Sequence, residues 1–164
     1  MGAVYGTIPN LHRKMATSPS LVAAYWSASQ AFGKSSLTHH EQQVVLIAVS
    51  VANGCAYCVG AHSALADMVK LPSSVTEALR NRQPIPEPRF EVLRRFTEAV
   101  VEKRGWVETS DVDAFLASGF THQQVLEVVL GVGLKTLSNY TNHIVDTELD
   151  SAFRDRSWTA RKSS

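Results

Sequence analysis

The chain has no excess of charge of either sign, because 16 lysines and arginines are balanced by 15 acidic residues and the net charge is +1. No lysine–arginine cluster forms a stripe able to neutralise several phosphates, which argues against nucleic-acid binding. No apolar run is long enough to span a bilayer. The first residues also lack a charged start followed by a long apolar stretch. We therefore expect no nucleic-acid partner, no membrane association and a cytoplasmic location.

Strand signals are scarce as well, whereas helix start and stop signals recur. Ser18 followed by Pro19 is typical of a helix start and predicts a helix over 21–32. Thr38 and Glu41 have the spacing of a capping box. The segment from Thr38 to Gly54 contains VVLIAVSVA, which alone could be a buried strand. Its cap, its terminal glycine and its length of about four turns favour a buried helix.

Further helices are expected downstream, at residues 55–70, 74–82, 90–105, 110–119 and 121–137. Two more capping boxes are expected there, Ser74–Glu77 and Thr121–Gln124. The proline-rich segment QPIPEP is typical of a loop, and we expect it to connect two helices within one domain. Gly131 and Gly133 weaken the last helix, although small residues there allow close approach of a neighbouring helix or subunit. The sequence thus predicts one all-α domain over 1–164, a helical bundle of about seven or eight helices.

Cysteine is scarce, and the only two, Cys55 and Cys58, lie in NGCAYCVGAH. On a helix, with about 100° per residue, both sulfurs and the imidazole of His62 fall within about 60° of one another. Cys55 follows Gly54 at the expected helix N-terminus, where the helix dipole favours a thiolate. A nucleophile, a second thiol able to form a disulfide and a base therefore share one face, which predicts a redox-active dithiol.

Two other interpretations stay open. Buried free cysteines can be ordinary small core residues, but the only two of this chain lie two residues apart with a histidine four later. Cys-x2-Cys also forms half of many zinc sites, and His62 could be a third ligand, with His143 or a second subunit as the fourth. The second half of such a site is missing from the sequence. We therefore expect no metal and no cofactor.

The segment LTHHEQQVVLIAVSVANGCAYCVGAHS resembles the core of the alkyl hydroperoxidase D-like proteins, within the carboxymuconolactone decarboxylase superfamily. The resemblance is strongest over residues 35–70 and includes the Leu-Thr helix start, the NGCxYC turn and the histidine four after the second cysteine. The later segment FLASGFTHQQVLEVVLGVGLKTLSNYTNHI resembles the second half of small members described as peroxidase-related. Together the two segments cover most of the chain.

The resemblance implies a helical protein that assembles as a homo-trimer or homo-hexamer. Cys58 corresponds to the peroxidatic cysteine, which attacks a peroxide as a thiolate and becomes a sulfenic acid. Cys55 corresponds to the resolving cysteine, which closes a disulfide that an external thiol or dithiol donor reduces. His62 corresponds to a member of the proton relay. The helix dipole by itself favours the thiolate on Cys55, whereas the family assigns the attack to Cys58.

Two positions depart from the better-known relatives. Gln43 stands where they place a glutamate, and an amide cannot accept a proton as a general base. Tyr57 stands between the cysteines where the family can carry a histidine, and tyrosine is a poor base near neutral pH. Glu41 is the candidate substitute for the missing base, although it also fits the capping box. The expected relay therefore consists of Glu41 and His62, with Gln43 and Tyr57 as hydrogen-bonding groups.

His143 belongs to a polar and aromatic cluster after the last apolar helix, together with Asn139, Tyr140 and Asn142. This cluster is expected to line the cleft near the cysteines or a subunit contact, or else to form a hydrogen-bond network at the helix end. His143 is accordingly a candidate site-lining residue, less strongly supported than the residues around the cysteines.

The leading functional prediction is a thiol-dependent antioxidant oxidoreductase that reduces hydroperoxides through the Cys-x-x-Cys pair. Its electron donor would be an external thiol or dithiol, and a peroxiredoxin is one candidate partner. The first alternative is an enzyme that acts on a small lactone, in the sense of the superfamily name, which would not need two thiols. The second is a zinc-binding or thiol-sensing protein without turnover.

Overall fold

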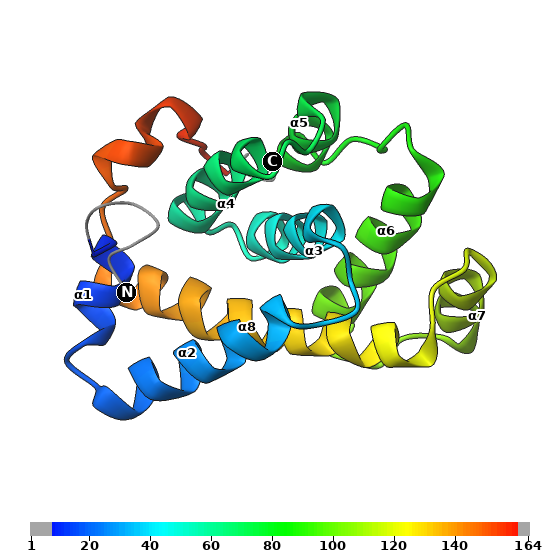
Figure 1. The fold of residues 1–164 in the computed structure, drawn as a ribbon, viewed down its shortest axis with the longest axis horizontal. Helices are drawn as coiled ribbons and strands as arrows, with labels where there is room; N and C mark the ends of the chain where they lie inside the picture. The colour runs from blue at the N-terminus through cyan, green and yellow to red at the C-terminus, as the bar shows by residue number, and fades with distance from the viewer. Residues whose placement is uncertain (1–7, 161–164) are drawn as a thin grey trace.

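The computed structural model describes residues 8–160, and within that range the chain is all-α, as predicted. It forms eight α-helices and one 3-10 helix, arranged around a central helix (Figure 1). The elements are α1 (Asn10–Met15), α2 (Pro19–Gly33), α3 (His39–Ala52), α4 (Ala56–Met68), α5 (Ser73–Arg80), α6 (Pro88–Glu102), α7 (Thr109–Ala117), α8 (His122–Val145) and η1 (Ser151–Arg156).

Helix α3 is the core of the domain, and it packs against α4, α5, α6 and α8. The apolar run VVLIAVSVA forms a helix because its start is capped and because neighbouring helices bury it. The predicted capping box is present: the hydroxyl of Thr38 accepts from Glu41 N at 3.2 Å, and Glu41 Oε2 accepts from Thr38 N at 2.8 Å. A fully covered helix can be apolar all round, which explains its strand-like composition.

Helix α8 is 24 residues long and crosses beneath α3 (Figure 1). Its predicted capping box, Thr121 with Gln124, is confirmed. Gly131 allows the expected close approach, because a Cβ there would lie 2.7 Å from Val45 Cγ1 and 2.8 Å from Phe32 Cε2. A Cβ at Gly133 would meet nothing within 4 Å in the described part of the chain. Gly131 therefore sets how closely α8 approaches α3 and α2.

The predicted capping box of Ser74 and Glu77 is wrong. Helix α5 begins at Ser73, with Pro72 at its N-cap and no side-chain cap. Proline fixes the backbone angle needed to enter a helix, so α5 starts without a capping side chain. Glu77 instead faces two guanidinium groups, at 3.6 Å from Arg80 and 3.4 Å from Arg156.

Two short elements, α1 and η1, are absent from the predicted set. Helix α1 has no capping side chain of its own, and its first amide, Asn10 N, donates to Asp150 Oδ1 at 3.0 Å and Oδ2 at 3.2 Å. Its N-terminus is thus capped by a residue 140 positions away. A six-residue helix capped in this way carries little local sequence signal.

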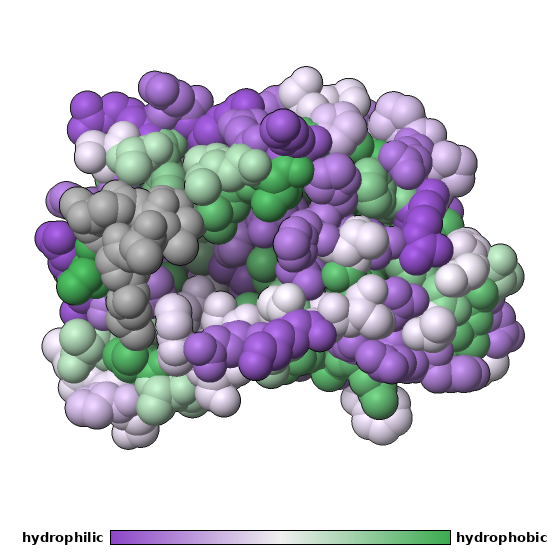
Figure 2. Space-filling model, in the orientation of Figure 1, coloured by the Kyte–Doolittle hydropathy of each residue, from purple (hydrophilic) through white to green (hydrophobic). Residues whose placement is uncertain are grey.

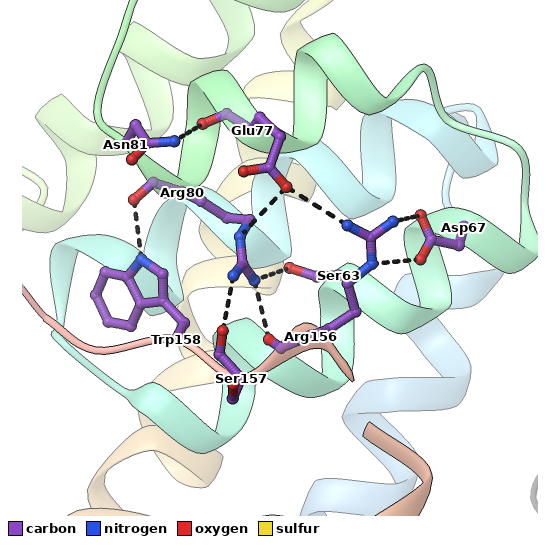
Figure 3. A network of polar contacts seen from close by, with 8 residues as sticks. All are labelled: Ser63, Asp67, Glu77, Arg80, Asn81, Arg156, Ser157 and Trp158. Carbon is purple, nitrogen blue, oxygen red and sulfur yellow. Dashed lines mark hydrogen bonds and ion pairs between the residues drawn. The ribbon is translucent and has the colours of Figure 1, made fainter. Parts of the chain in front are cut away.

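The C-terminal segment is fixed to α4 and α5 by the polar network in Figure 3. Arg80 donates to Ser63 Oγ and to the backbone oxygen of Arg156, both at 3.0 Å. Arg156 in turn forms two 2.6 Å bonds with the carboxylate of Asp67. The indole of Trp158 donates to Arg80 O at 2.9 Å. This network holds η1 against α4, the helix that carries the cysteines.

The surface in Figure 2 mixes hydrophilic and apolar residues. Across residues 8–160, no helix combines the length and the apolar character required to cross a membrane. The exposed apolar side chains include several on α8, among them Leu126, Val129, Tyr140 and Ile144.

Candidate active site

The turn between α3 and α4 places the two cysteines. Gly54 has a φ of +68°, a left-handed conformation that glycine adopts without a steric penalty. Cys55 N then bonds to Ser50 O at 2.9 Å, which closes the end of α3 in the manner of a Schellman turn. Cys55 becomes the N-cap residue of α4, and Cys58 lies in the first helical turn. Both are free thiols and both are buried.

One face of α8 surrounds the sulfur atoms. The side-chain amide of Asn142 donates to Cys58 Sγ at 3.2 Å and to Cys55 Sγ at 3.7 Å. The hydroxyl of Ser138 lies 3.8 Å from Cys58 Sγ. Ser138, Asn142 and the neighbouring Lys135 are spaced by three and four positions, so they share one side of the helix. Cys58 therefore receives more hydrogen-bonding groups than Cys55.

The two thiols have opposite pKa shifts. A hydrogen bond from Cys55, followed by the charge of Lys135 and hydrogen bonds from Ser138 and Lys135, holds the pKa of Cys58 well below its usual value despite burial. The hydrogen bond to Cys58, followed by burial, raises the pKa of Cys55. These shifts favour the anion on Cys58, against the helix-dipole expectation for Cys55. Although Cys55 is the N-cap residue of α4, its side chain accepts no hydrogen bond from the amides of the first turn.

Lys135 is the charged residue of the site and was not among the predicted residues. Its side chain is on an apolar helix, and the residue is only 1% exposed. Its Nζ lies 3.0 Å from His62 Nε2. Across residues 8–160 it has no carboxylate partner within 4.0 Å, unlike Arg80, Arg89 and Lys103. Burial lowers the pKa of Lys135, but the interaction with Cys58, followed by those with Tyr25 and Cys55, raises it overall.

His62 lies between Lys135 and Gln43. Its Nδ1 is 3.1 Å from Gln43 Oε1, and because that amide oxygen can only accept, Nδ1 carries the proton. Its Nε2 is then free to accept from Lys135. Desolvation, followed by the charge of Lys135, lowers the pKa of His62 well below its usual value. His62 is therefore neutral and is linked to Cys58 through Lys135. Gln43 lies in the site, as predicted for a hydrogen-bonding group.

Glu41 does not join this arrangement. One of its carboxylate oxygens completes the capping box with Thr38, and the other accepts from Arg89 Nε at 2.7 Å. Within residues 8–160, no contact links it to His62 or Cys58. Capping and ion pairing therefore account for Glu41, and its expected role as a replacement base finds no support in the geometry.

Tyr57 lines a cavity together with Cys58, His62 and Lys135, but its hydroxyl bonds to groups outside that cluster, and His143 lies apart from it. The hydroxyl of Tyr57 donates to Asp150 Oδ2 at 2.6 Å and accepts from Leu11 N at 3.3 Å. Burial, followed by the hydrogen bond to Asp150, raises the pKa of Tyr57, so it stays a phenol. It joins α1 and the C-terminal segment to α4. His143 is exposed, with its ring 6.5 Å from that of Tyr140, and the structure does not bring it to the cysteines.

A cavity of about 80 Å³ opens beside Cys58. His62 and Lys135 line its polar side, and Tyr25 of α2 lines it as well. The apolar walls come from α1, α4 and η1 and include Leu11, Leu65 and Phe153. The elements that were not predicted thus form part of the cavity wall. Nowhere in the described part of the chain do three or more His, Cys, Asp or Glu side chains gather as a metal site would require.

Comparison with known proteins agrees with this fold. The sequence profile of the carboxymuconolactone decarboxylase family matches residues 19–99, from the start of α2 into α6. The chain belongs to this family and has the alkyl hydroperoxidase D-like fold. A search of curated proteins finds no significant match.

Three solved structures share the fold at low sequence identity. A peroxidase-related protein from Ralstonia eutropha JMP134, with an alkylhydroperoxidase AhpD core, has a TM-score of 0.84 and 23% identity, over 93% of this chain and 82% of its own. A peroxidase-related protein from Silicibacter sp. TM1040 has a TM-score of 0.82 and 19% identity, over the same shares. The debrominase Bmp8 in its apo form has a TM-score of 0.80 and 16% identity, over 95% of this chain and 85% of its own.

Proposed function

We propose that this protein is a thiol-dependent oxidoreductase that reduces hydroperoxides through Cys58 and Cys55. The observation that carries the proposal is that Cys58 and the buried Lys135 line one cavity, where Asn142 also donates to Cys58 Sγ at 3.2 Å. A lysine without a carboxylate partner stabilises an anion nearby, and the pKa of the Cys58 thiol lies well below its usual value. A thiolate is the reactive form of cysteine toward peroxides and disulfides.

The proposed cycle has three steps. The thiolate of Cys58 attacks the terminal oxygen of a hydroperoxide, which breaks the O–O bond and leaves a sulfenic acid. The thiol of Cys55 then attacks the Cys58 sulfur, forms the Cys55–Cys58 disulfide and releases water. The raised pKa of Cys55 suits this order, because its largest cause, the hydrogen bond to Cys58, and the charge of Cys58 are lost once Cys58 is oxidised, although burial remains. An external thiol or dithiol, with a peroxiredoxin as one candidate, regenerates both thiols.

The cavity favours a compact substrate. A volume of about 80 Å³ with apolar walls suits a small alkyl hydroperoxide better than a long-chain one. The test is stopped-flow mixing of the reduced protein with tert-butyl hydroperoxide, followed by thiol counting and mass spectrometry. We expect the loss of both thiols and the formation of one intramolecular disulfide.

The two cysteine variants separate their roles. Cys55→Ser should consume one peroxide and stop at the sulfenic acid of Cys58, detectable with a dimedone probe. Cys58→Ser should consume peroxide no faster than free thiol does. If Cys58→Ser reacts as fast as the unmodified protein, the assignment of the nucleophile is wrong.

A second candidate function is reductive dehalogenation. The debrominase Bmp8, as a cysteine-to-alanine variant in complex with 2,3,4-tribromopyrrole, shares this fold with a TM-score of 0.79 and 16% identity over 92% of this chain and 82% of its own. The apolar cavity beside a thiolate favours this candidate. In such a step the C–Br bond breaks as bromine passes to the Cys58 sulfur, and the pyrrole carbon takes a proton. Cys55 then displaces bromide, loses its proton and forms the disulfide. Bromide release from a brominated pyrrole, with no peroxide consumption, would support it. Turnover of a small lactone after alkylation of both thiols would instead support the superfamily's decarboxylase chemistry.

We also propose that the chain forms a homo-trimer or homo-hexamer in the cytoplasm. Leu126, Val129, Tyr140 and Ile144 follow one another along α8 and are exposed, which a subunit contact would cover. A reducing compartment would supply the thiol donor. Light scattering coupled to size-exclusion chromatography measures the assembly directly, and a monomeric mass would contradict this part of the proposal.

A further inference from the structure

The site contains a buried lysine that the disulfide cycle alone does not explain. Lys135 is 1% exposed and lies on a helix whose other buried residues are mostly apolar or uncharged. Burying an ammonium group costs several kcal/mol unless an anion compensates. Within residues 8–160 no carboxylate lies within 4.0 Å of it, and the acidic group that lines the same cavity is Cys58, whose thiolate is therefore the compensating anion.

The groups that face Lys135 from the neighbouring helices are neutral apart from Cys58. His62 on α4 accepts from Nζ at 3.0 Å and is uncharged. Tyr25 on α2 stays a phenol, because burial raises its pKa. Cys55 stays a thiol, because the hydrogen bond to Cys58 and burial raise its pKa. Oxidation of Cys58 therefore removes the only anion that stabilises the ammonium group in this part of the chain.

We propose that Lys135 is a catalytic acid: its ammonium group protonates the oxygen that leaves when Cys58 is oxidised, and Lys135 becomes a neutral amine. This inference rests on the proposed function and deepens it. In the first step, the sulfur of Cys58 forms a bond to the terminal peroxide oxygen and the O–O bond breaks. The electron pair stays on the alkoxide, which takes a proton from Lys135 and leaves as an alcohol. Sulfur is oxidised by two electrons and the peroxide is reduced by two.

The remaining steps also balance. Cys55 loses its proton as it attacks Cys58, and that proton joins the departing hydroxide to form water. The disulfide then stands beside a neutral amine, so no uncompensated charge is buried. When an external dithiol reduces the disulfide, Cys58 is released as a thiol and transfers its proton to the amine. This step restores the pairing of thiolate and ammonium.

His62 is a positioning residue in this scheme. Its neutral imidazole holds Nζ through Nε2, and Gln43 fixes the ring by accepting from Nδ1 at 3.1 Å. A neutral acceptor orients the ammonium group without giving it a second anion. Lys135 is therefore free to release its proton once the thiolate has been consumed.

The first measurement needs no variant. The midpoint potential of the Cys55–Cys58 couple is measured as a function of pH around neutrality, in equilibrium with a dithiol of known potential. If Lys135 loses its proton on oxidation, two protons are released for every two electrons, one from Cys55 and one from Lys135. If Lys135 is a static cation, only the proton of Cys55 is released. Lys135→Arg keeps a permanent cation and should release one proton.

The second measurement varies the leaving group. Lys135→Met removes the acid while keeping the length of the side chain, and Lys34→Met is the control at an exposed lysine. Each rate is divided by the thiolate fraction, measured by ultraviolet absorbance. With tert-butyl hydroperoxide, Lys135→Met should react about 10²- to 10⁴-fold more slowly per thiolate. With peracetic acid, whose leaving carboxylate needs no proton, the rate per thiolate should stay within about threefold. Lys34→Met should match the unmodified protein with both oxidants.

The outcomes separate the two proposals. Release of one proton per two electrons by the unmodified protein, or equal slowing of Lys135→Met with both oxidants, overturns the role of Lys135 as an acid. In either case the dithiol cycle itself stands. If the unmodified protein forms no disulfide with either oxidant, the proposed function fails. The potential measurement still decides whether Lys135 titrates with the couple, even if Lys135→Met does not fold.

Discussion

Replacing Gly131 with alanine tests how α8 is held in place. An added Cβ would lie 2.7 Å from Val45 Cγ1 and 2.8 Å from Phe32 Cε2, both well inside van der Waals contact. Neither neighbour can yield easily, because Val45 is fully buried and Phe32 is 2% exposed. Gly133, two positions along the same helix, has nothing within 4 Å of the same added atom among the described residues. The two glycines therefore form a matched pair.

The magnitude follows from two opposing effects. Alanine in place of glycine inside a helix stabilises the fold by about 1 kcal/mol, and this gain applies at both positions. Overpacking a closed core destabilises it by about 1–3 kcal/mol, and this loss applies only at Gly131. Gly133→Ala should therefore raise the free energy of unfolding by about 1 kcal/mol. Gly131→Ala should lower it by up to about 2 kcal/mol, so the two variants differ by about 1–3 kcal/mol.

Urea denaturation of both variants, followed by circular dichroism at one protein concentration, measures this difference directly. Size-exclusion chromatography of Gly133→Ala shows whether a subunit contact has changed. Because Lys135 lies one turn beyond Gly131, the clash in Gly131→Ala should also move the ammonium group away from Cys58. The thiolate of Cys58 would then be less stabilised, so alkylation of Cys58 at neutral pH should slow. Equal stability of the two variants would show that α8 does not pack against α3 as closely as the structure places it.

Three further predictions concern the site. Because its pKa is lowered, Cys58 should be alkylated by iodoacetamide at a constant rate as the pH falls from about 8.5 to neutrality, whereas Cys55 should stay unmodified. An alkylation rate that falls tenfold per pH unit would contradict the lowered pKa of Cys58. Gln43→Glu should place a carboxylate beside His62 Nδ1 and raise the pKa of His62, visible as a new imidazole titration by NMR. Asp150→Ala should remove the acceptor of one backbone donor, Asn10 N, and one side-chain donor, the hydroxyl of Tyr57. This variant should lower the free energy of unfolding by about 1–3 kcal/mol and speed alkylation of Cys58. An unchanged free energy and an unchanged alkylation rate would argue against Asp150 as the residue that holds α1 in place.

The long helices were predictable because their signals are local. Thr38 with Glu41 and Thr121 with Gln124 satisfy backbone groups within their own first turns, so the sequence alone locates these starts. Helix α1 was not predictable in this way. Its N-terminal amide is satisfied by Asp150 from the opposite end of the chain, and no local pattern encodes such a partner.

The sequence predicted the helix face shared by Cys55, Cys58 and His62 but missed the charged residue beside it, Lys135. The spacing of Cys55, Cys58 and His62 along α4 follows from helix geometry, and no other element is needed to derive it. Lys135 lies 73 positions from His62, and its single charge in an apolar stretch was the only sequence signal available. Glu41 matched two patterns equally well in the sequence, and the approach of Arg89 accounts for its second carboxylate oxygen.

The sequence by itself determined the all-α class, the main helices and the presence of two thiols and an imidazole on one helix face, because each depends on residues within a few turns of one another. The tertiary structure decided which thiol carries the negative charge. Besides the hydrogen bond from Cys55, that choice depends on Lys135 and Ser138, which α8 brings to Cys58, where Asn142 also donates at 3.2 Å. Electrostatic stabilisation acts through space, so it becomes visible only once helices distant in sequence have been packed together.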